Sequence, residues 1–160
     1  MRDNVMKLLN EQINAEFYAA YIYLSMAAYF EDKDLAGFAH WMRMQSAEEL
    51  THAQKIFDYV IERGGRVVLE QIDAPPSDFD SPLDVFEKAL AHEQKVTAMI
   101  DHLYAQAEKE SDYPTQVMLQ WFITEQVEEE NTAGTLVAQL KMAGDSPAAL
   151  LVFDRQLASR

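Results

Sequence analysis

Long stretches without glycine or proline are the feature that most constrains how this chain can fold. The 160 residues contain five glycines and five prolines. The segments between them are rich in Ala, Leu, Glu, Gln, Lys and Met, which favour helix. Ser81-Pro82 and Ser146-Pro147 each place a capping serine before a proline suited to the first helical position. The sequence therefore predicts five helices, at about 4–32, 35–63, 82–111, 114–143 and 147–157.

Apolar residues recur at alternating steps of three and four along the four long segments, as in the inward seams of a helix bundle. The predicted fold class is all-α: a four-helix bundle with a long crossover between helices two and three, plus a short C-terminal fifth helix. Each seam is interrupted near its middle by a glutamate, and one seam also carries His52. The four glutamates are Glu16, Glu49, Glu93 and Glu129.

The lengths of the connections predict that these glutamates meet at one level of the bundle. Glu16 and Glu49 are equidistant from the first predicted turn. Glu93 and Glu129 are equidistant from Ser111, beside the third predicted turn. The intervening loop, residues 64–81, could reach about 60 Å when extended, whereas a helix of about 29 residues is about 43 Å long. The loop can therefore cross the bundle, which makes helices two and three parallel.

Four carboxylates gathered in a core need compensation, because burying an unpaired ion costs several kcal/mol. No lysine or arginine falls on the seams beside them. A pair of divalent cations would compensate, and oxygen ligands with one imidazole suit iron or manganese and can admit zinc. The alternative is a different helix register that leaves the glutamates in solvent. For Glu49 and His52 alone, a solvated face would be the commoner arrangement.

The ligand-type residues fall in four short pieces: Glu16, ELTH at 49–52, Glu93 and EQVEEE at 125–130. Together these pieces resemble the non-haem ferritins of the bacterial kind, and the resemblance covers nearly the whole chain. It implies a single ferritin-like domain over 1–160 and a hollow cage of 24 subunits. It also implies ferroxidase activity: Fe(II) would be oxidised by O₂ or hydrogen peroxide and stored as a ferric mineral.

The resemblance further implies a dinuclear iron site in which Glu49 bridges the two metals. Haem is not expected, because the methionine that binds it in bacterioferritins is matched here by Leu50. The first iron would also be bound by the catalytic residues Glu16 and His52, with Gln126 close by. The second iron would also be bound by the catalytic residues Glu93 and Glu129.

Bacterial members of this family often add a third iron site near the pair. The matching positions are Glu48, Glu125 and Glu128, and Glu129 could be shared with the dinuclear site. Tyr23 matches a tyrosine that can donate an electron during catalysis, and Trp121 matches a nearby tryptophan. Plain core packing is the alternative for both aromatic residues.

Two other functions remain open at this point. The first is a di-iron oxidase or peroxidase that keeps its metals permanently. The second is a helical bundle that buffers metal without oxygen chemistry. Many di-iron enzymes carry a second Glu-x-x-His motif on helix four, where this chain has Gln126 and Glu129, so its histidine is missing. That departure favours the storage protein over the oxidase.

The composition argues against several classes of function. The net charge of −14 repels nucleic acid and anionic membrane surfaces and favours cations. The absence of cysteine excludes disulfides and thiolate-bound metal clusters. The start of the chain shows no apolar signal region, and the longest nearly apolar stretch, 19–30, is too short to span a bilayer. We therefore expect a cytoplasmic protein without nucleic-acid or membrane partners.

The predicted fifth helix carries several apolar residues, although a completed four-helix bundle has little apolar surface left for them to cover. Self-association would bury them, in keeping with a homo-oligomer. The alternative is that this helix folds onto the end of its own bundle. The residues concerned are Leu150, Leu151, Phe153 and Leu157.

Overall fold

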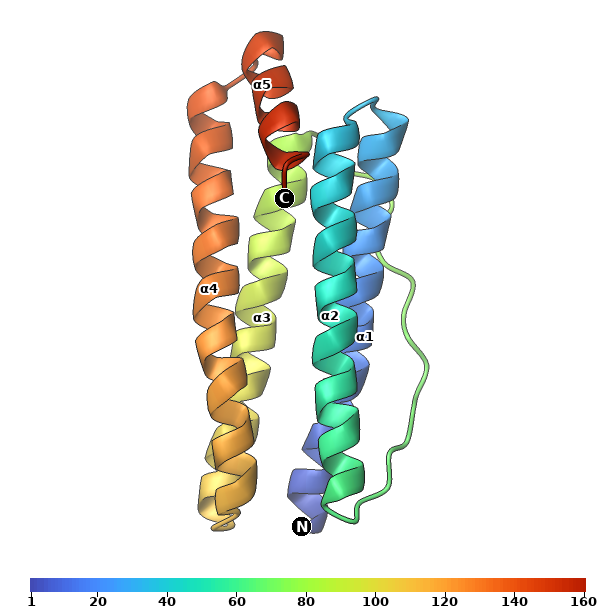
Figure 1. Ribbon diagram of the computed structural model, residues 1–160, viewed down its shortest axis with the longest axis vertical. Coiled ribbons are helices and arrows are strands. Elements are labelled where there is room, and N and C mark those ends of the chain that lie inside the picture. Colours follow the sequence, from blue (N-terminus) through green and yellow to red (C-terminus); the bar gives the residue numbers. More distant parts are fainter.

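The computed structural model describes residues 1–160 and contains five helices and no strand. Four long helices form a bundle, and a short helix packs at one end of it (Figure 1). The predicted fold class is therefore confirmed. The helices are α1 Asp3–Asp32, α2 Ala36–Glu62, α3 Pro82–Lys109, α4 Tyr113–Ala143 and α5 Pro147–Leu157.

The long loop between α2 and α3 runs along the outside of α1 from one end of the bundle to the other (Figure 1). Side chains of α1 hold it there. Asn10 donates to the carbonyl of Arg66 at 3.1 Å and accepts from the amide of Val68 at 2.8 Å. Ser25 donates to the carbonyl of Pro76 at 2.6 Å. Because the loop crosses the whole bundle, α2 and α3 run parallel, as predicted.

The ends of the helices follow the local signals in the sequence. Ser81 accepts from the amide of Asp84 at 3.1 Å, and Ser146 accepts from the amide of Ala149 at 3.3 Å. Both predicted caps are thus present, each before a proline in the first turn. The turn into α4 contains Ser111 at φ 54°, a left-handed conformation that tightens the chain reversal.

The core consists of two apolar clusters, one toward each end of the bundle. The larger cluster is rich in aromatic rings, and Phe30 stacks on Phe38 with ring centroids 4.8 Å apart. The other contains aliphatic residues such as Leu9, Ile56 and Ile100. Along every long helix buried polar residues lie between the two clusters, with a few buried alanines among them. The bundle therefore has a polar level enclosed above and below by hydrocarbon.

Helix α5 folds back onto its own bundle, so the alternative considered for this helix is the one observed. Leu157 is buried in the larger cluster, and Leu150 and Phe153 pack against it. Leu151 and Val152 face outward and are exposed. The helix therefore uses part of its apolar surface within the chain and leaves part of it free.

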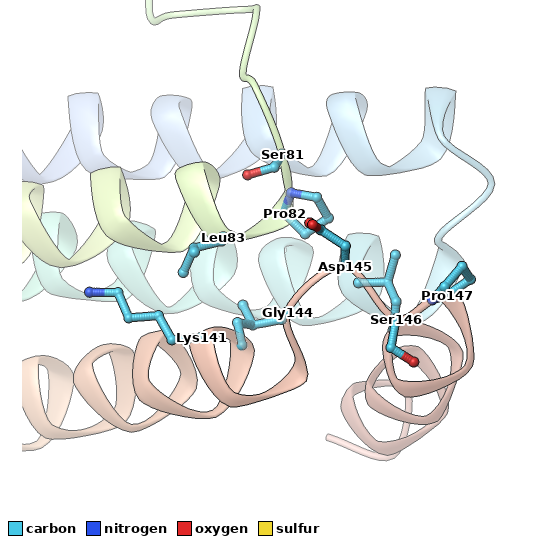
Figure 2. A pocket seen from close by; sticks show the side chains of 10 residues that line it. Ser81, Pro82, Leu83, Lys141, Gly144, Asp145, Ser146 and Pro147 are labelled. Atoms are coloured by element: carbon cyan, nitrogen blue, oxygen red, sulfur yellow. The ribbon is translucent and has the colours of Figure 1, made fainter.

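A pocket of about 390 Å³ lies where the α4–α5 turn meets the start of α3 (Figure 2). Its charged lining residues are Lys141 and Asp145 alone, and the rest are apolar, proline, glycine or serine. This lining offers no cluster of metal-ligating groups. The chemically distinctive part of the molecule is the buried polar level.

A membrane span requires a helix that is both long and apolar, and none of the five helices meets both requirements.

Candidate metal centre

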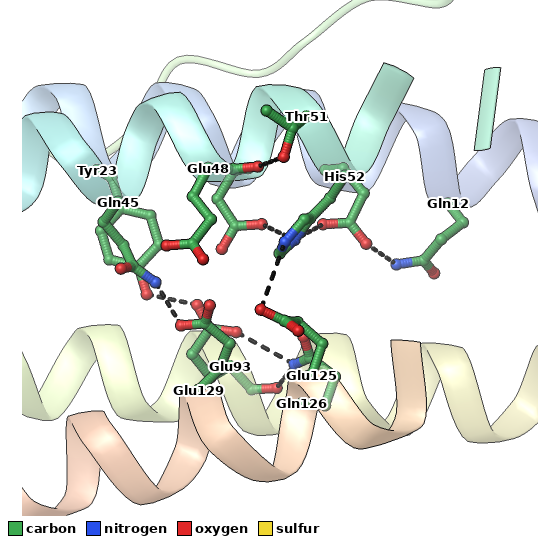
Figure 3. A network of polar contacts seen from close by, with 12 residues as sticks. Gln12, Tyr23, Gln45, Glu48, Thr51, His52, Glu93, Glu125, Gln126 and Glu129 are labelled. Carbon is green, nitrogen blue, oxygen red and sulfur yellow. Dashed lines mark hydrogen bonds and ion pairs between the residues drawn. The ribbon is translucent and has the colours of Figure 1, made fainter. Parts of the chain in front are cut away.

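All four long helices contribute to the polar level. Glu16 comes from α1, Glu49 and His52 from α2, Glu93 from α3 and Glu129 from α4, and all five side chains are buried. Figure 3 shows the network of polar contacts around them. The four glutamates expected to meet at one level do so. A register that leaves them in solvent is excluded.

The donor atoms form two overlapping triads. Glu16, Glu49 and His52 each offer an atom within 4.8 Å of the other two, and so do Glu49, Glu93 and Glu129. Glu49 belongs to both triads. A carboxylate has two oxygens, so one side chain at this position can bind two cations at once. The geometry therefore suits a dinuclear centre with Glu49 between the metals.

The electrostatics of the centre show a deficit of positive charge. Burial raises the pKa of Glu16 to about 7 and the pKa of Glu129 to about 8. Burial also raises the pKa of Glu93, and burial together with the other carboxylates raises that of Glu49 well above its ordinary value. The only basic side chain within ion-pair distance of them is the imidazole of His52. Divalent cations would remove this deficit.

A second observation fits bound metal. The Oε2 atom of Glu16 is buried and has no hydrogen-bond partner, although Oε1 accepts from Gln12 at 2.7 Å. A buried acceptor without a partner is costly, and a metal ligand bond would satisfy it. His52 is suited to the same purpose, because burial lowers its pKa to about 4 and so keeps it neutral, the form that binds metal. Its Nδ1 lies 3.0 Å from Glu49.

The comparisons with known proteins agree with this geometry. Residues 6–143 match the model of the ferritin family, described as a ferritin-like domain. The chain belongs to the ferritin family. It is 44% identical over 158 residues to a bacterial non-heme ferritin of Bacteroides fragilis, covering 99% of this chain and 98% of that one.

Two further relatives show the same likeness along the full length. A bacterial non-heme ferritin of Staphylococcus haemolyticus is 40% identical over 157 residues, covering 98% of this chain and 95% of that one. Among solved structures, an open pore ferritin from the archaeon Archaeoglobus fulgidus has a TM-score of 0.99 and 49% identity, covering 100% of this chain and 99% of that one. This chain is therefore a ferritin of the bacterial non-haem type, an iron-storage protein with a buried candidate di-iron site.

Gln126 of this ferritin sits on the side of the second triad. Its amide nitrogen donates to Glu93 Oε2 at 3.1 Å, to the Glu93 carbonyl at 3.2 Å and to Thr97 Oγ1 at 3.2 Å. The resemblance placed it close to the first iron instead. Because the amide is neutral, it adds a donor to the centre without adding a fifth buried negative charge.

The two aromatic residues singled out in the sequence have different surroundings. Tyr23 is fully buried, and its hydroxyl donates to Glu93 Oε1 (Figure 3). Trp121 is 39% exposed and lies edge-on to His52, with ring centroids 5.4 Å apart. The ammonium of Lys55 lies 4.4 Å from its centroid on the indole face. Tyr23 thus contacts a candidate ligand directly, whereas Trp121 shields the histidine from solvent.

A third set of donors lies beside the dinuclear centre. Glu48, His52, Glu125 and Glu129 each offer an atom within 4.8 Å of the others; we call these four residues the outer cluster. Glu48 and Glu125 were expected in a third site. Glu128 was expected there too, but it is exposed and does not belong to the cluster.

Two glutamines that sequence reasoning did not assign to the site contact its carboxylates. Gln12 donates to Glu16, and Gln45 donates to Glu129 (Figure 3). The available signal was spacing, because Gln12 precedes Glu16 by one helical turn and Gln45 precedes Glu49 by one turn. An amide four residues before a buried carboxylate is therefore worth inspecting in similar sequences.

Proposed function

We propose that this ferritin oxidises Fe(II) at the dinuclear centre and stores the Fe(III) product as a mineral inside a cage of 24 chains. The observation that carries the proposal is the position of Glu49, shared by two buried triads that lack cationic partners. Two cations bound there would be held close together by one carboxylate. Hard anionic oxygen ligands favour Fe(III) over Fe(II), which assists oxidation.

The reaction balances with two iron ions and one oxidant. Two Fe(II) lose two electrons, which with two protons reduce O₂ to hydrogen peroxide, or reduce hydrogen peroxide to two waters. Protons are also exchanged when iron binds, because carboxyl groups of raised pKa such as Glu129 carry protons in the metal-free protein near neutral pH. The centre therefore gives up protons as it takes up Fe(II).

Tyr23 is proposed as a transient electron donor to this reaction: an electron that it gives to the oxidant is returned to it by Fe(II), so the overall balance of two electrons from two Fe(II) is unchanged. Its hydroxyl donates to Glu93, so the ring lies one hydrogen bond from a ligand of the second iron. Tyr23→Phe keeps the ring and its packing while removing the hydroxyl. We expect this variant to bind two cations normally and to oxidise Fe(II) more slowly in stopped-flow absorbance measurements. An unchanged rate would leave Tyr23 with a packing role only.

Oxygen consumption separates the ferroxidase from a bundle that merely buffers metal. Adding two Fe(II) per chain to the metal-free protein in air should consume O₂ faster than the same iron in buffer. A protein that binds the iron and leaves O₂ untouched would be a buffer. A permanent di-iron oxidase would hold its two metals through chelation and gel filtration, whereas Fe(II) supplied to a ferritin moves on into the mineral.

Assembly and location complete the proposal. Several large apolar side chains are exposed on the isolated chain, among them Val117, Val127 and Met142, and a cage would cover such residues. We place the protein in the cytoplasm, where Fe(II) is available as substrate. The strongly negative charge favours attraction of Fe(II), and neither nucleic acid nor membrane is expected as a partner.

A further inference from the structure

The side chain of Arg160, just beyond α5, reaches the edge of the candidate metal centre. Its Nη2 atom lies 2.7 Å from Oε2 of Glu48, and its Nη1 atom donates to Oε1 of Gln45 at 2.7 Å. The guanidinium also packs on the ring of Trp41 at 4.7 Å, and Nη1 donates to the Trp41 carbonyl at 3.4 Å. The guanidinium group of Arg160 is thus held in place by contacts on several sides.

These contacts connect Arg160 to two members of the outer cluster. Glu48 is contacted directly. Glu129 is reached through Gln45, whose amide oxygen accepts from Arg160 while its amide nitrogen donates to Glu129 Oε2. No other arginine or lysine forms an ion pair with a member of this cluster. Arg160 is therefore the one arginine or lysine that pairs directly with a carboxylate of the cluster, whereas Lys55 lies over Trp121 on the side of His52.

We propose that Arg160 is a positioning residue that weakens binding of a third divalent cation at the outer cluster. The inference rests on the proposed function, because it assumes that these carboxylates bind metal. The guanidinium occupies one oxygen of Glu48 and keeps a positive charge beside it. An incoming cation must share Glu48 with that charge or displace it. A third ion would then be held loosely and pass on readily.

The dinuclear centre should be far less affected. Glu16, Glu49 and Glu93 make no contact with Arg160 and are buried inside the bundle, and Glu129 is linked to it only through the neutral amide of Gln45. Arg160 and Glu48 are by contrast 31% and 36% exposed in their side chains, so their interaction is screened by solvent and salt. The expected effect is therefore confined to the third cation and becomes smaller as ionic strength rises.

Calorimetric titration of the metal-free, assembled protein with Zn(II) tests this. We expect two tight equivalents per chain and a weaker third in the wild type. In Arg160→Ala the third equivalent should bind about tenfold more tightly, the ordinary size of a coupling between neighbouring sites. The first two equivalents should stay within about twofold of the wild type. Arg160→Lys keeps the charge and should leave the third equivalent close to the wild type.

Arg155→Ala is the matched control. Arg155 lies on α5, five residues before Arg160, is exposed and forms no ion pair, so this variant removes the same charge without touching the cluster. Its third equivalent should bind as in the wild type. Arg160→Gln, neutral and of similar reach, serves as a second variant if alanine loosens α5, which thermal unfolding will show.

Three results would overturn the inference. The first is an unchanged or weaker third equivalent in both Arg160→Ala and Arg160→Gln. The second is equal tightening in Arg155→Ala, since the effect would then be one of net charge. The third is a change in unfolding temperature alone, which would give Arg160 a purely structural role. A wild-type protein that binds no Zn(II) would instead overturn the proposed function, and this inference with it.

Discussion

The chemistry of single residues explains why the metal-free centre is a costly part of this ferritin. Four carboxyl groups share a buried space with one neutral imidazole. Their raised pKa values mean that protons replace the missing cations, which lowers the electrostatic cost without removing it. Metal ions and protons therefore compete for the same carboxylate oxygens. The outcome of this competition changes close to neutral pH, where Glu16 and Glu129 titrate.

We expect the metal-free protein to lose stability between about pH 6.5 and 8.5. Folding raises the pKa of Glu16 from 4.5 to about 7 and that of Glu129 to about 8, so the folded state holds more protons than the unfolded state in this range. Stability then falls as pH rises. Buried histidines such as His52, whose pKa folding lowers, oppose this decline near pH 6.5, where the unfolded imidazole is about half protonated. Above about pH 7.5 the imidazole is neutral in both states and no longer contributes.

Urea unfolding of chelator-treated protein at several pH values measures this dependence. Glu129→Gln is the matched variant, because it keeps the shape of the side chain and removes one titrating group. It should be more stable than the wild type at pH 8.5 and show a shallower decline. A stability that stays level or rises over this range in the wild type would contradict the electrostatic account.

The shared position of Glu49 leads to a prediction about stoichiometry. Glu49→Gln replaces the charged ligand shared by both triads with a neutral amide that has a single oxygen, whereas His52→Ala removes a ligand from the first triad only. We expect Glu49→Gln to weaken both tight Zn(II) equivalents by at least about tenfold, and His52→Ala to weaken one. Calorimetry counts the equivalents. Equal effects of the two substitutions would show that Glu49 does not lie between the metals.

At the residue scale the sequence supported much of the site, for an identifiable reason. A glutamate on an apolar seam has an environment that helical spacing alone predicts. Glu128 lies outside the outer cluster, and spacing is a poorer guide at the margin of a seam. Each residue turns the helix by about 100°. With Gln126 and Glu129 facing inward, Glu125 stays near the edge of the seam while Glu128 turns away from it.

At the scale of elements, helix lengths followed from glycine, proline and capping serines, but the direction of α5 did not. That direction depends on a contact between Gly37 and Asp154, 117 residues apart. Asp154 Oδ1 accepts from the amides of Gly37 at 2.8 Å and Phe38 at 3.0 Å, so it caps the start of α2. The local sequence of neither helix predicts that Asp154 contacts the start of α2.

Substitutions at this contact should release α5. A Cβ atom added at Gly37 would lie 1.7 Å from the carbonyl oxygen of Asp154, so Gly37→Ala forces the two helices apart. We expect it to cost about 1–3 kcal/mol. Asp154→Ala loses the cap and should cost about 1 kcal/mol. Gly134→Ala, where the added Cβ meets nothing within 4 Å, is the control.

Chemical denaturation at fixed pH measures these differences in the free energy of unfolding. Gly134→Ala should be neutral or slightly stabilising, because alanine favours helix over glycine. A Gly37→Ala protein as stable as this control would show that α5 docks differently from the arrangement described above.

At the scale of the whole molecule, a fold with two apolar clusters and a polar level between them is suited to redox chemistry in a closed space. The hydrocarbon on either side limits water and fixes the helices that carry the ligands. The crossing of the long loop could be predicted from its length alone. The proposed cage could not, because its arrangement depends on surfaces between molecules that a single chain does not define.

The iron retained per chain after aerobic addition of Fe(II), measured across a size-exclusion profile, tests the central claim most directly. We predict a particle many times heavier than the 18.3 kDa chain, carrying far more iron than the few ions that the carboxylates can bind. Such iron can only be a stored mineral. Iron that stops at two or three ions per chain, on a small oligomer, would contradict storage and leave only a metal-binding helical bundle.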